Sequence, residues 1–483
     1  MSLQQTLMGR FASLEADAPP EDDLDIESPE EGTDDTGAQL DGENIVEGDL
    51  VEAAEDSAEV DEADDEAEEL EDTSDSLESF LMAAQIGKQK GGWTDGEALA
   101  YGLGLDATLK RLGGSSSDIL PSLESFSGTA RERLESTAAV ENRIKDALMA
   151  IWDAIKRAVN KVVAFVRKWY VKIFDGASRL KKRAEAIRKK AENTQGTAKE
   201  KKLVTSTLSH LHINKSMPDS KDIAAGIKNV GIAVTNLTSQ RLDKNYGTSI
   251  DALVTIITEL ADGKGAGSLN GAIAKVGKLK DSKIFECDLG ITLKAAGAEE
   301  AKRFIPVGIE GLTVSFFQSD ILPGGQRLGN FTYEMADQTD KRAVGRTFAA
   351  AMRSVNKVIA FEASNKKVEI DTSKEIKILE PNGIVHICNE VIDFCKIVVD
   401  YKLGFESYDK KNSAALAKID GVVRKAGNND EDRDNAEYVR GLAQGFGSII
   451  RNRGTGITNT INLGMTMSRN ALVYSVQSLA MYN

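Results

Sequence analysis

The chain contains few histidines, cysteines, prolines and aromatic residues for its length. Its 483 residues include three histidines, three cysteines, eight prolines and 6% aromatic residues. The cysteines, Cys287, Cys388 and Cys395, are odd in number and irregularly spaced. This argues against a disulfide framework and favours a reducing compartment.

Long hydrophobic runs are also absent. No apolar stretch approaches the ~20 residues that a helix needs to cross a bilayer. Residues 1–10 lack the continuous apolar stretch of a secretory signal, so we expect neither a transmembrane helix nor such a signal. The spacing of the apolar residues near the start instead predicts a short amphipathic helix over residues 1–15 that docks on a partner: Leu3, Leu7, Met8, Phe11 and Leu14.

Patterns typical of metal sites and catalytic centres are weak. His210 and His212 alternate in sequence, while His386, Cys388 and Cys395 fall on one predicted helix at spacings that do not match a zinc site. We therefore expect no metal or cofactor, and we interpret the two helical cysteines as core residues.

Sequence motifs for nucleotide binding and acyl transfer are also missing. The glycine-rich stretch 263–267 lacks the spacing of a phosphate-binding P-loop, and no Gly-x-Ser-x-Gly elbow occurs. With three histidines and no convincing acid–base pair, the sequence predicts a protein that is not an enzyme and has no small-molecule substrate. An active site built on lysine or carboxylates stays open as an alternative.

Charge is distributed very unevenly along the chain. Residues 1–80 hold 30 Asp and Glu and one basic residue, Arg10, whereas residues 81–483 hold 59 Lys and Arg against 46 Asp and Glu. The overall net charge of −16 therefore combines an acidic arm with a basic body. A basic body attracts nucleic acid, and a tethered acidic arm would compete for the same surface.

The composition of the arm predicts disorder. Residues 1–80 are poor in aromatic and β-branched residues, and acidic runs occur at 52–59 and 61–72. Such segments bury too little apolar surface to offset the entropy of ordering. We expect residues 1–80 to be a disordered acidic arm, and residues 81–141 to be a flexible segment.

The strongest periodic pattern predicts a long amphipathic helix over residues 129–175, which contain no glycine or proline. A second helix is predicted over 177–192. Residues 142–202 hold 18 Lys and Arg against 6 Asp and Glu, so this basic amphipathic segment carries most of the positive charge of the body. The candidate DNA-contacting residues are Lys156, Arg157, Lys161, Arg167, Lys168, Lys181, Lys182, Arg183, Arg188, Lys189 and Lys190.

Three interpretations of this basic segment remain open. Its cations would neutralise DNA phosphates without reading bases. Trp152, Trp169 and the flanking lysines would suit an interfacial membrane helix. As a purely structural element, the apolar stripe would pack on the rest of the chain or on a second copy, giving a homo-oligomer.

The remainder, residues 203–483, is predicted to form a mixed globular domain of the helix-rich α+β class. A turn is expected at Pro323–Gly325. The predicted helices are 220–239, 248–262, 269–279, 339–361, 385–401, 414–425, 432–450 and 470–481. The predicted strands are 283–293, 307–318, 367–371 and 375–379.

A repeated pentapeptide is the most specific local motif. Ser-Leu-Glu-Ser-Phe occurs at residues 76–80 and again at 122–126, and Ser-Leu-Glu also occurs at 13–15. A flexible segment with small residues around one acid suits the cleft of a protease. Helix capping by the serines is the structural alternative, but capping does not require an identical pentapeptide.

With this repeat and the acidic arm, the chain resembles the internal head proteins of giant phiKZ-like tailed bacteriophages. That resemblance implies an acidic propeptide that the phage's prohead protease removes by cutting after Glu in a Ser/Ala/Gly-x-Glu motif. The motif places candidate cuts after Glu15, Glu78, Glu124 and Glu141, with further matches ending at residues 55 and 59. Among them, Glu124 and Glu141 are favoured as the final site.

We thus expect a structural virion protein packed inside the phage head, and present in the host cytoplasm during assembly. Removal of the arm would let the basic remainder contact packaged DNA without sequence preference. Two rivals remain: a scaffold or capsid-lining protein that binds other head proteins, and an ejected protein that acts at the host membrane.

Overall fold

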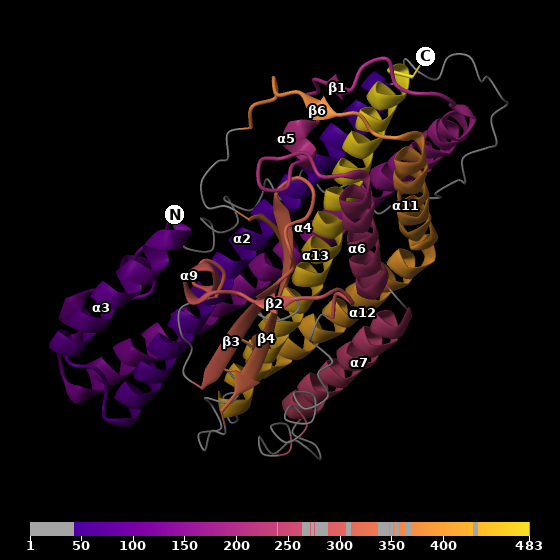
Figure 1. Ribbon diagram of the computed structural model, residues 1–483. Helices are drawn as coiled ribbons and strands as arrows, with labels where there is room; N and C mark the ends of the chain where they lie inside the picture. The colour runs from indigo at the N-terminus through magenta and orange to yellow at the C-terminus, as the bar shows by residue number, and fades with distance from the viewer. Residues whose placement is uncertain are drawn as a thin grey trace.

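The computed structural model describes most of the chain from residue 43 onward. Its described residues are 43–238, 240–262, 288–305, 311–336, 351–352, 357–363, 370–427, 433–482 and the single residues 271, 275 and 347. Long helices dominate, with two small sheets beside them (Figure 1). The predicted helix-rich α+β class is confirmed.

Three helices form the frame of the molecule: α2 (Glu43–Gln89), α4 (Ala130–Asn193) and α13 (Arg433–Ala480). They lie side by side along the centre of Figure 1 and pack on one another. The other helices are α3 (Asp95–Leu109), α5 (Leu208–Leu211), α6 (Ser220–Thr238), α7 (Gln240–Asp262), α9 (Ala298–Ala301), α11 (Pro381–Asp400) and α12 (Lys402–Gly427), with the short 3-10 helices η1 (Lys110–Leu112), η2 (Ser116–Asp118) and η3 (Leu123–Phe126).

Both sheets are antiparallel. β1 (Lys202–Leu203) pairs with β6 (Ile376–Lys377), and a four-stranded sheet has the order β2 (Lys294–Ala295), β3 (Leu312–Gln318), β4 (Gln326–Met335), β5 (Val358–Glu362). Gly324 and Gly325 have φ of +95° and +71° between β3 and β4, so the predicted turn at 323–325 is confirmed. Phe316, Phe331 and Phe361 form a small aromatic core on this sheet.

Helix α2 corrects the prediction of a disordered arm for residues 43–80. The segment 49–86 contains no glycine or proline and is rich in Ala, Glu and Leu, which favour helix. From Ala67 onward an apolar stripe, Leu70, Leu77, Leu81 and Ala84, is buried. These few apolar residues are spaced so that they share one face of the helix and pack against the fold. The overall composition of the arm does not reveal this stripe. Residues 1–42, including the predicted helix at 1–15, lie outside the described residues.

The segment 81–141 is also ordered, contrary to the prediction of flexibility. α2 continues to Gln89, and α3 follows with a capping box in which Thr94 and Glu97 satisfy each other's backbone N–H groups. α4 begins with a second capping box, formed by Thr129 and Glu132. Trp93 is buried at the centre of this region and stacks on Tyr101 at 4.6 Å between ring centroids.

Two long helices replace pairs of predicted shorter ones. α4 runs through Gly176, where two helices were predicted, and α13 runs through 451–469, where a break was predicted. The glycines responsible for those predictions lie at helix contacts. A Cβ at Gly454 would come within 3.2 Å of Val166, and one at Gly464 within 2.3 Å of Phe394. Close packing therefore outweighs the low helix propensity of glycine.

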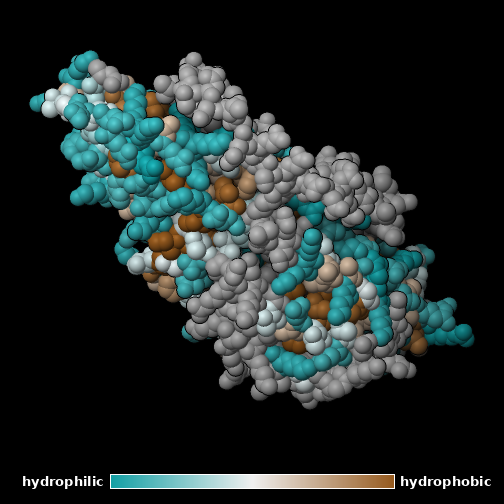
Figure 2. Space-filling view, turned by 90° about the vertical axis from the view of Figure 1, so that its right-hand side faces the viewer, coloured by the Kyte–Doolittle hydropathy of each residue, from teal (hydrophilic) through white to brown (hydrophobic). Residues whose placement is uncertain are grey.

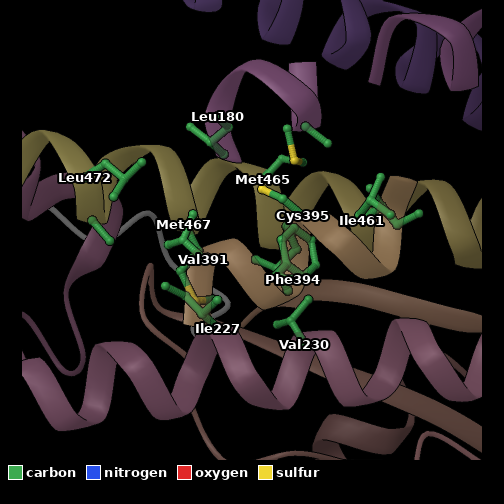
Figure 3. Close-up of a cluster of buried hydrophobic side chains, with 14 of the residues drawn as sticks. Leu180, Ile227, Val230, Val391, Phe394, Cys395, Ile461, Met465, Met467 and Leu472 are labelled. Carbon is green, nitrogen blue, oxygen red and sulfur yellow. The ribbon is translucent and has the colours of Figure 1, made fainter. Parts of the chain in front are cut away.

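Two hydrophobic cores share α4 and α13. The first joins α2, α3, α7 and α12 to the N-terminal halves of these two helices, and the second joins α6 and α11 to their C-terminal halves. Figure 3 shows the second core, where Met465 and Met467 of α13 meet Val391 and Phe394 of α11. Because α4 and α13 contribute to both cores, they connect the two cores into one fold.

Other predictions for 203–483 have mixed outcomes. Helices 220–239, 248–262, 385–401 and 414–425 correspond to α6, α7, α11 and α12, and strands 307–318 and 375–379 contain β3 and β6. The helix predicted over 339–361 is wrong at its end, where β5 forms, and β4 was not predicted. Short apolar runs do not by themselves distinguish strand from helix. The described parts of the predicted strands 283–293 and 367–371 are not strand; the rest of both, and most of 269–279, lie outside the described residues.

Candidate processing site and charged helix interface

The candidate cleavage residue Glu124 lies exposed on η3, between α3 and α4. Ser122 and Leu123 before it are also exposed. The backbone around it makes two 3-10 hydrogen bonds, from Ser125 N to Ser122 O at 3.0 Å and from Ser127 N to Glu124 O at 3.2 Å. A protease would have to open this short turn and withdraw Phe126, which is buried beside Trp93, to extend the segment.

The other two described candidates are buried inside long helices. Glu78 lies in the middle of α2, and both its carboxylate oxygens accept hydrogen bonds from Arg440 of α13. Glu141 lies in α4, with its side chain 1% exposed, between Lys88 at 3.0 Å and Lys145 at 3.2 Å. Burial tends to raise the pKa of Glu141, but the two lysines outweigh it and leave that pKa below its ordinary value.

The remaining motif matches differ in their setting. Glu15 lies outside the described residues. Residues 55 and 59 belong to helix α2. Among the candidate cuts named above that the structure describes, Glu124 is therefore the one on a short surface turn.

The acidic face of α2 meets α13 in a buried ion-pair cluster, formed by Asp64, Glu71 and Glu78 of α2 with Arg440 and Arg451 of α13. Arg451 Nε lies 2.7 Å from Asp64 Oδ1, and its Nη1 lies 2.8 Å from Glu71 Oε1. The side chains of Arg451 and Glu71 are 1% and 0% exposed. The three acids recur every seven residues, so they share one face of α2.

Burial and pairing oppose each other in this cluster. Burial lowers the pKa of the Arg451 guanidinium, but the charges of Glu71 and Asp64 outweigh that effect and raise its pKa above the ordinary value. Burial raises the pKa of Glu78, against the opposing effect of Arg440. Both arginines thus depend on the α2 carboxylates to remain buried as cations.

Neutral and peripheral contacts extend the cluster. Gln444 donates to Ser74 Oγ at 2.6 Å, and the Ser448 hydroxyl donates to Glu71. Lys357, next to β5, donates to Glu68 at 2.7 Å. Sequence reasoning missed every basic member of this interface; the available clue was the sevenfold spacing of leucine and acid in 64–78.

The basic residues predicted on α4 do not form one continuous open surface. Lys168, Lys182, Lys189 and Lys190 are exposed, whereas Lys156, Arg157, Lys161, Arg167, Lys181, Arg183 and Arg188 are partly buried. Several have local roles. Lys156 Nζ lies 3.1 Å from Asp420, and Arg188 donates to Asn389 at 3.1 Å. The exposed cations concentrate toward the C-terminal end of α4.

The apolar stripe of α4 packs within the fold. Trp152 and Trp169 are buried, and their indole N–H groups donate to Asp420 and Asn462, both at 3.0 Å. The stripe is consequently occupied by α2, α11 and α13 in this structure and does not face a membrane. None of the helices in the described part of the chain contains an apolar stretch that could span a bilayer.

The predicted core cysteines are buried thiols. Cys388 and Cys395 lie on α11, and burial raises both pKa values to about 12. Cys287 lies outside the described residues. Within the part of the chain that the structure describes, no three His, Cys, Asp or Glu residues gather to hold a metal ion.

Several exposed leucines lie on and around α3, at the end of the molecule away from α6 and α11 of the second core. Leu99 and Leu103 of α3 are 52% and 67% exposed, and Ile86, Leu123 and Leu134 nearby are also exposed. This end projects at the left of Figure 1. By comparison, Figure 2 shows a face on which hydrophilic side chains separate small hydrophobic areas.

Comparison with known proteins agrees with the resemblance seen in the sequence. A family model of phiKZ-like phage internal head proteins matches residues 25–464. The match includes α2, the ion-pair cluster and Glu124. No curated protein and no solved structure matches the chain.

Proposed function

Because the chain belongs to the phiKZ-like phage internal head protein family, we propose that it is a structural precursor that the prohead protease cuts after Glu124. The family places the protein inside the phage head, in association with other head components. The N-terminal segment (residues 1–124) carries the excess of acidic residues, and the body (residues 125–483), which has a net positive charge, meets packaged DNA once the segment has gone.

The exposure of Glu124 is the observation that carries this proposal. Processing needs an extended backbone in the cleft of the protease, and η3 is a single turn whose opening breaks two turn hydrogen bonds and the bond from Ser136 Oγ to Ser125 O, and withdraws Phe126 from the core. Cutting at Glu78 or Glu141 in the folded precursor would require unwinding a packed helix and exposing a buried carboxylate.

Charge supports a DNA-contacting body. The N-terminal segment holds 35 Asp and Glu against 5 Lys and Arg, while the body holds 55 Lys and Arg against 41 Asp and Glu. Lys182, Lys189 and Lys190 are exposed at one end of α4. Cations of this kind bind phosphates without reading sequence, and their binding weakens steeply with salt.

The processing step is tested by mass spectrometry of the protein from purified virions. We expect an N-terminus at Ser125, and we expect Glu124→Ala to prevent its formation while Glu15→Ala leaves it unchanged. A virion protein that begins at Met1 contradicts the proposal.

The DNA contact is tested by a gel-shift assay at low salt, which compares the full precursor with protein recovered from virions. We expect only the virion form to bind, and we expect Lys182→Glu, Lys189→Glu and Lys190→Glu together to weaken it. The matched control changes the exposed Lys202, Lys302 and Lys377 to Glu. Equal binding by precursor and virion form rejects the masking role of the segment.

A second candidate function is binding to other head proteins through the exposed leucines of α3. Leu99 and Leu103 lie one helical turn apart at the projecting end of the molecule. Exposed apolar patches of this kind mark protein contacts. Loss of incorporation into heads on Leu99→Ser with Leu103→Ser, but not on Ala100→Ser, would favour this role.

A further inference from the structure

We propose that the cut after Glu124 does not by itself release the N-terminal segment: its described part, residues 43–124, stays bound to the body as a separate chain. This rests on the proposed cleavage and adds a second step to it. The groove between α4 and α13 is then a binding site for an acidic amphipathic helix.

The contacts that join the two parts do not depend on the Glu124–Ser125 peptide bond, although Phe126 makes one of them close to the cut. Trp93 N donates to Thr137 Oγ1 at 2.8 Å, and Lys88 pairs with Glu141 at 3.0 Å. Trp93 also contacts Phe126, on the other side of the cut, at 6.4 Å between ring centroids. These interactions cross from segment to body through space, so hydrolysis of the Glu124–Ser125 bond leaves each partner in place.

Apolar packing is the first force that holds the segment. Leu70, Leu77 and Leu81 of α2 are buried in the same core as Ile144 and Leu148 of α4. α3 adds Leu105 and Leu109 to this core. Departure of the segment would expose both sides of the interface to water, which is unfavourable in proportion to the apolar area uncovered.

The ion-pair cluster is the second force, and it also sets the specificity of the groove. Without α2, Arg440 and Arg451 would face an apolar groove with their carboxylate partners gone. The fitting occupant combines acids every seven residues with an adjacent leucine stripe. α2 has this arrangement over residues 64–78, whereas DNA offers phosphates without apolar side chains.

If the segment stays bound after the first cut, the processing sites are cut in a fixed order. While α2 remains in place, Glu78 stays bonded to Arg440 and Glu141 stays covered by Lys88. Once the segment leaves, the first turns of α4 lose their contacts with Trp93 and Lys88 and can fray, which exposes Glu141. Glu124 is therefore cut first and gives the N-terminus at Ser125, and a later cut after Glu141, once the segment has left, would give a second N-terminus at Asn142.

The test uses the full chain with a recognition sequence for a site-specific protease inserted between Glu124 and Ser125. After complete cutting, we expect both fragments to co-elute on size exclusion at about 1 μM, including in 0.5 M NaCl, and to separate in denaturant. Separate elution of the fragments in native buffer, from a protein that was folded before cutting, overturns the proposal.

Charge variants of the segment test the role of the cluster without altering the body. Glu71→Gln with Glu78→Gln should speed dissociation of the cut segment at least tenfold, while the exposed pair Glu62→Gln and Glu124→Gln should leave the rate unchanged. Equal rates for the two double variants would overturn the assignment of specificity to the cluster.

The outcomes separate this proposal from the proposed function. A virion protein that begins at Met1 rejects processing, but it leaves the co-elution of an artificially cut chain unaffected. Dissociation of the artificially cut chain rejects retention, but it leaves cleavage in the head unaffected.

Discussion

The two halves of α13 bury side chains of different chemistry. From Arg440 to Thr455 the helix buries apolar residues such as Leu442 and Phe446, and in addition two ion-paired arginines and the polar residues Gln444 and Ser448, which bond to α2. From Ile461 to Leu479 it buries mainly Ile, Leu and Met against α4, α6 and α11, and Ser475 there bonds to its own helix. Both halves of the helix therefore pack in an apolar core, and only the first half adds buried ion pairs with the N-terminal segment.

The difference matches the fates proposed for the two interfaces. An apolar interface is non-directional and tolerates varied packing, which suits parts that stay together. Buried ion pairs contribute little net stability but make an interface demand one partner in one register. We infer that the first half of α13 selects α2 as its partner, and that the second half keeps the helices of the body together.

The largest expected effect comes from removing one member of the ion-pair cluster. Arg451→Ala should lower the free energy of unfolding by about 3–5 kcal/mol, because Asp64 and Glu71 would remain buried without a cation. Chemical denaturation measures this, with Lys189→Ala on the exposed end of α4 as the control. In the apolar half, Ile461→Ala should cost about 2–5 kcal/mol through cavity formation.

A triple substitution separates loss of stability through unpaired buried charges from loss of stability through a cavity. Replacing Asp64, Glu71 and Arg451 together by Leu, Met and Met should recover most of the stability lost in Arg451→Ala. No rescue of this kind exists for Ile461→Ala. A triple variant as unstable as the single one would show that the charges, and not only their pairing, hold the interface.

A smaller effect is expected from glycines at helix contacts. Gly464→Ala should lower stability by about 1–3 kcal/mol, because its Cβ would lie 2.3 Å from the ring of Phe394. Gly421 on α12 has open space around the same position. Gly421→Ala should therefore raise stability by about 0.5–1 kcal/mol, and thermal unfolding of both variants checks the contrast.

Acidification should weaken the segment interface through Glu141. Its pKa is lowered in the folded protein, so its contribution is fully present above the ordinary glutamate value of 4.5 and is lost as the pH falls through the lowered folded value. The contribution of Glu78 to stability depends on pH in the opposite direction, because its pKa is raised in the folded protein. Between pH 6 and pH 3, the free energy of unfolding should fall less steeply for Glu141→Gln than for the native chain. Parallel pH profiles for the two proteins would show that Glu141 does not contribute to the loss of stability in acid.

The smallest effect should follow Lys88→Ala. The lysine is 38% exposed, so its ion pair with Glu141 contributes about 1 kcal/mol or less to stability. The change should nevertheless speed proteolysis of the cut protein at Glu141, followed by mass spectrometry, whereas Lys90→Ala should not. An unchanged rate would contradict the covering role of Lys88.

Much of the fold follows from local patterns. The stripe of Ile and Val after residue 139 predicts α4, and similar periodicity predicts α6 and α11. The family was also recognisable from the repeat at 76–80 and 122–126 and from the acidic arm. The two copies of that repeat nevertheless have different structures: Glu78 is buried in α2, and Glu124 is exposed on η3. Identical pentapeptides differ in this way because their surroundings, and not their own residues, determine burial.

The sequence by itself determined the separation of charge, the helical character of residues 129–192 and the candidate cleavage motif. Only the tertiary structure decided that residues 64–80 of the acidic arm belong to a packed helix, because the apolar residues of α2 between 67 and 84 need the faces of α4 and α13 to bury them. It also decided that the partners of the arm are Arg440 and Arg451, more than 350 residues away in the chain. Charge composition predicts attraction between two regions, but the pairing of particular side chains depends on which helix faces the fold brings together.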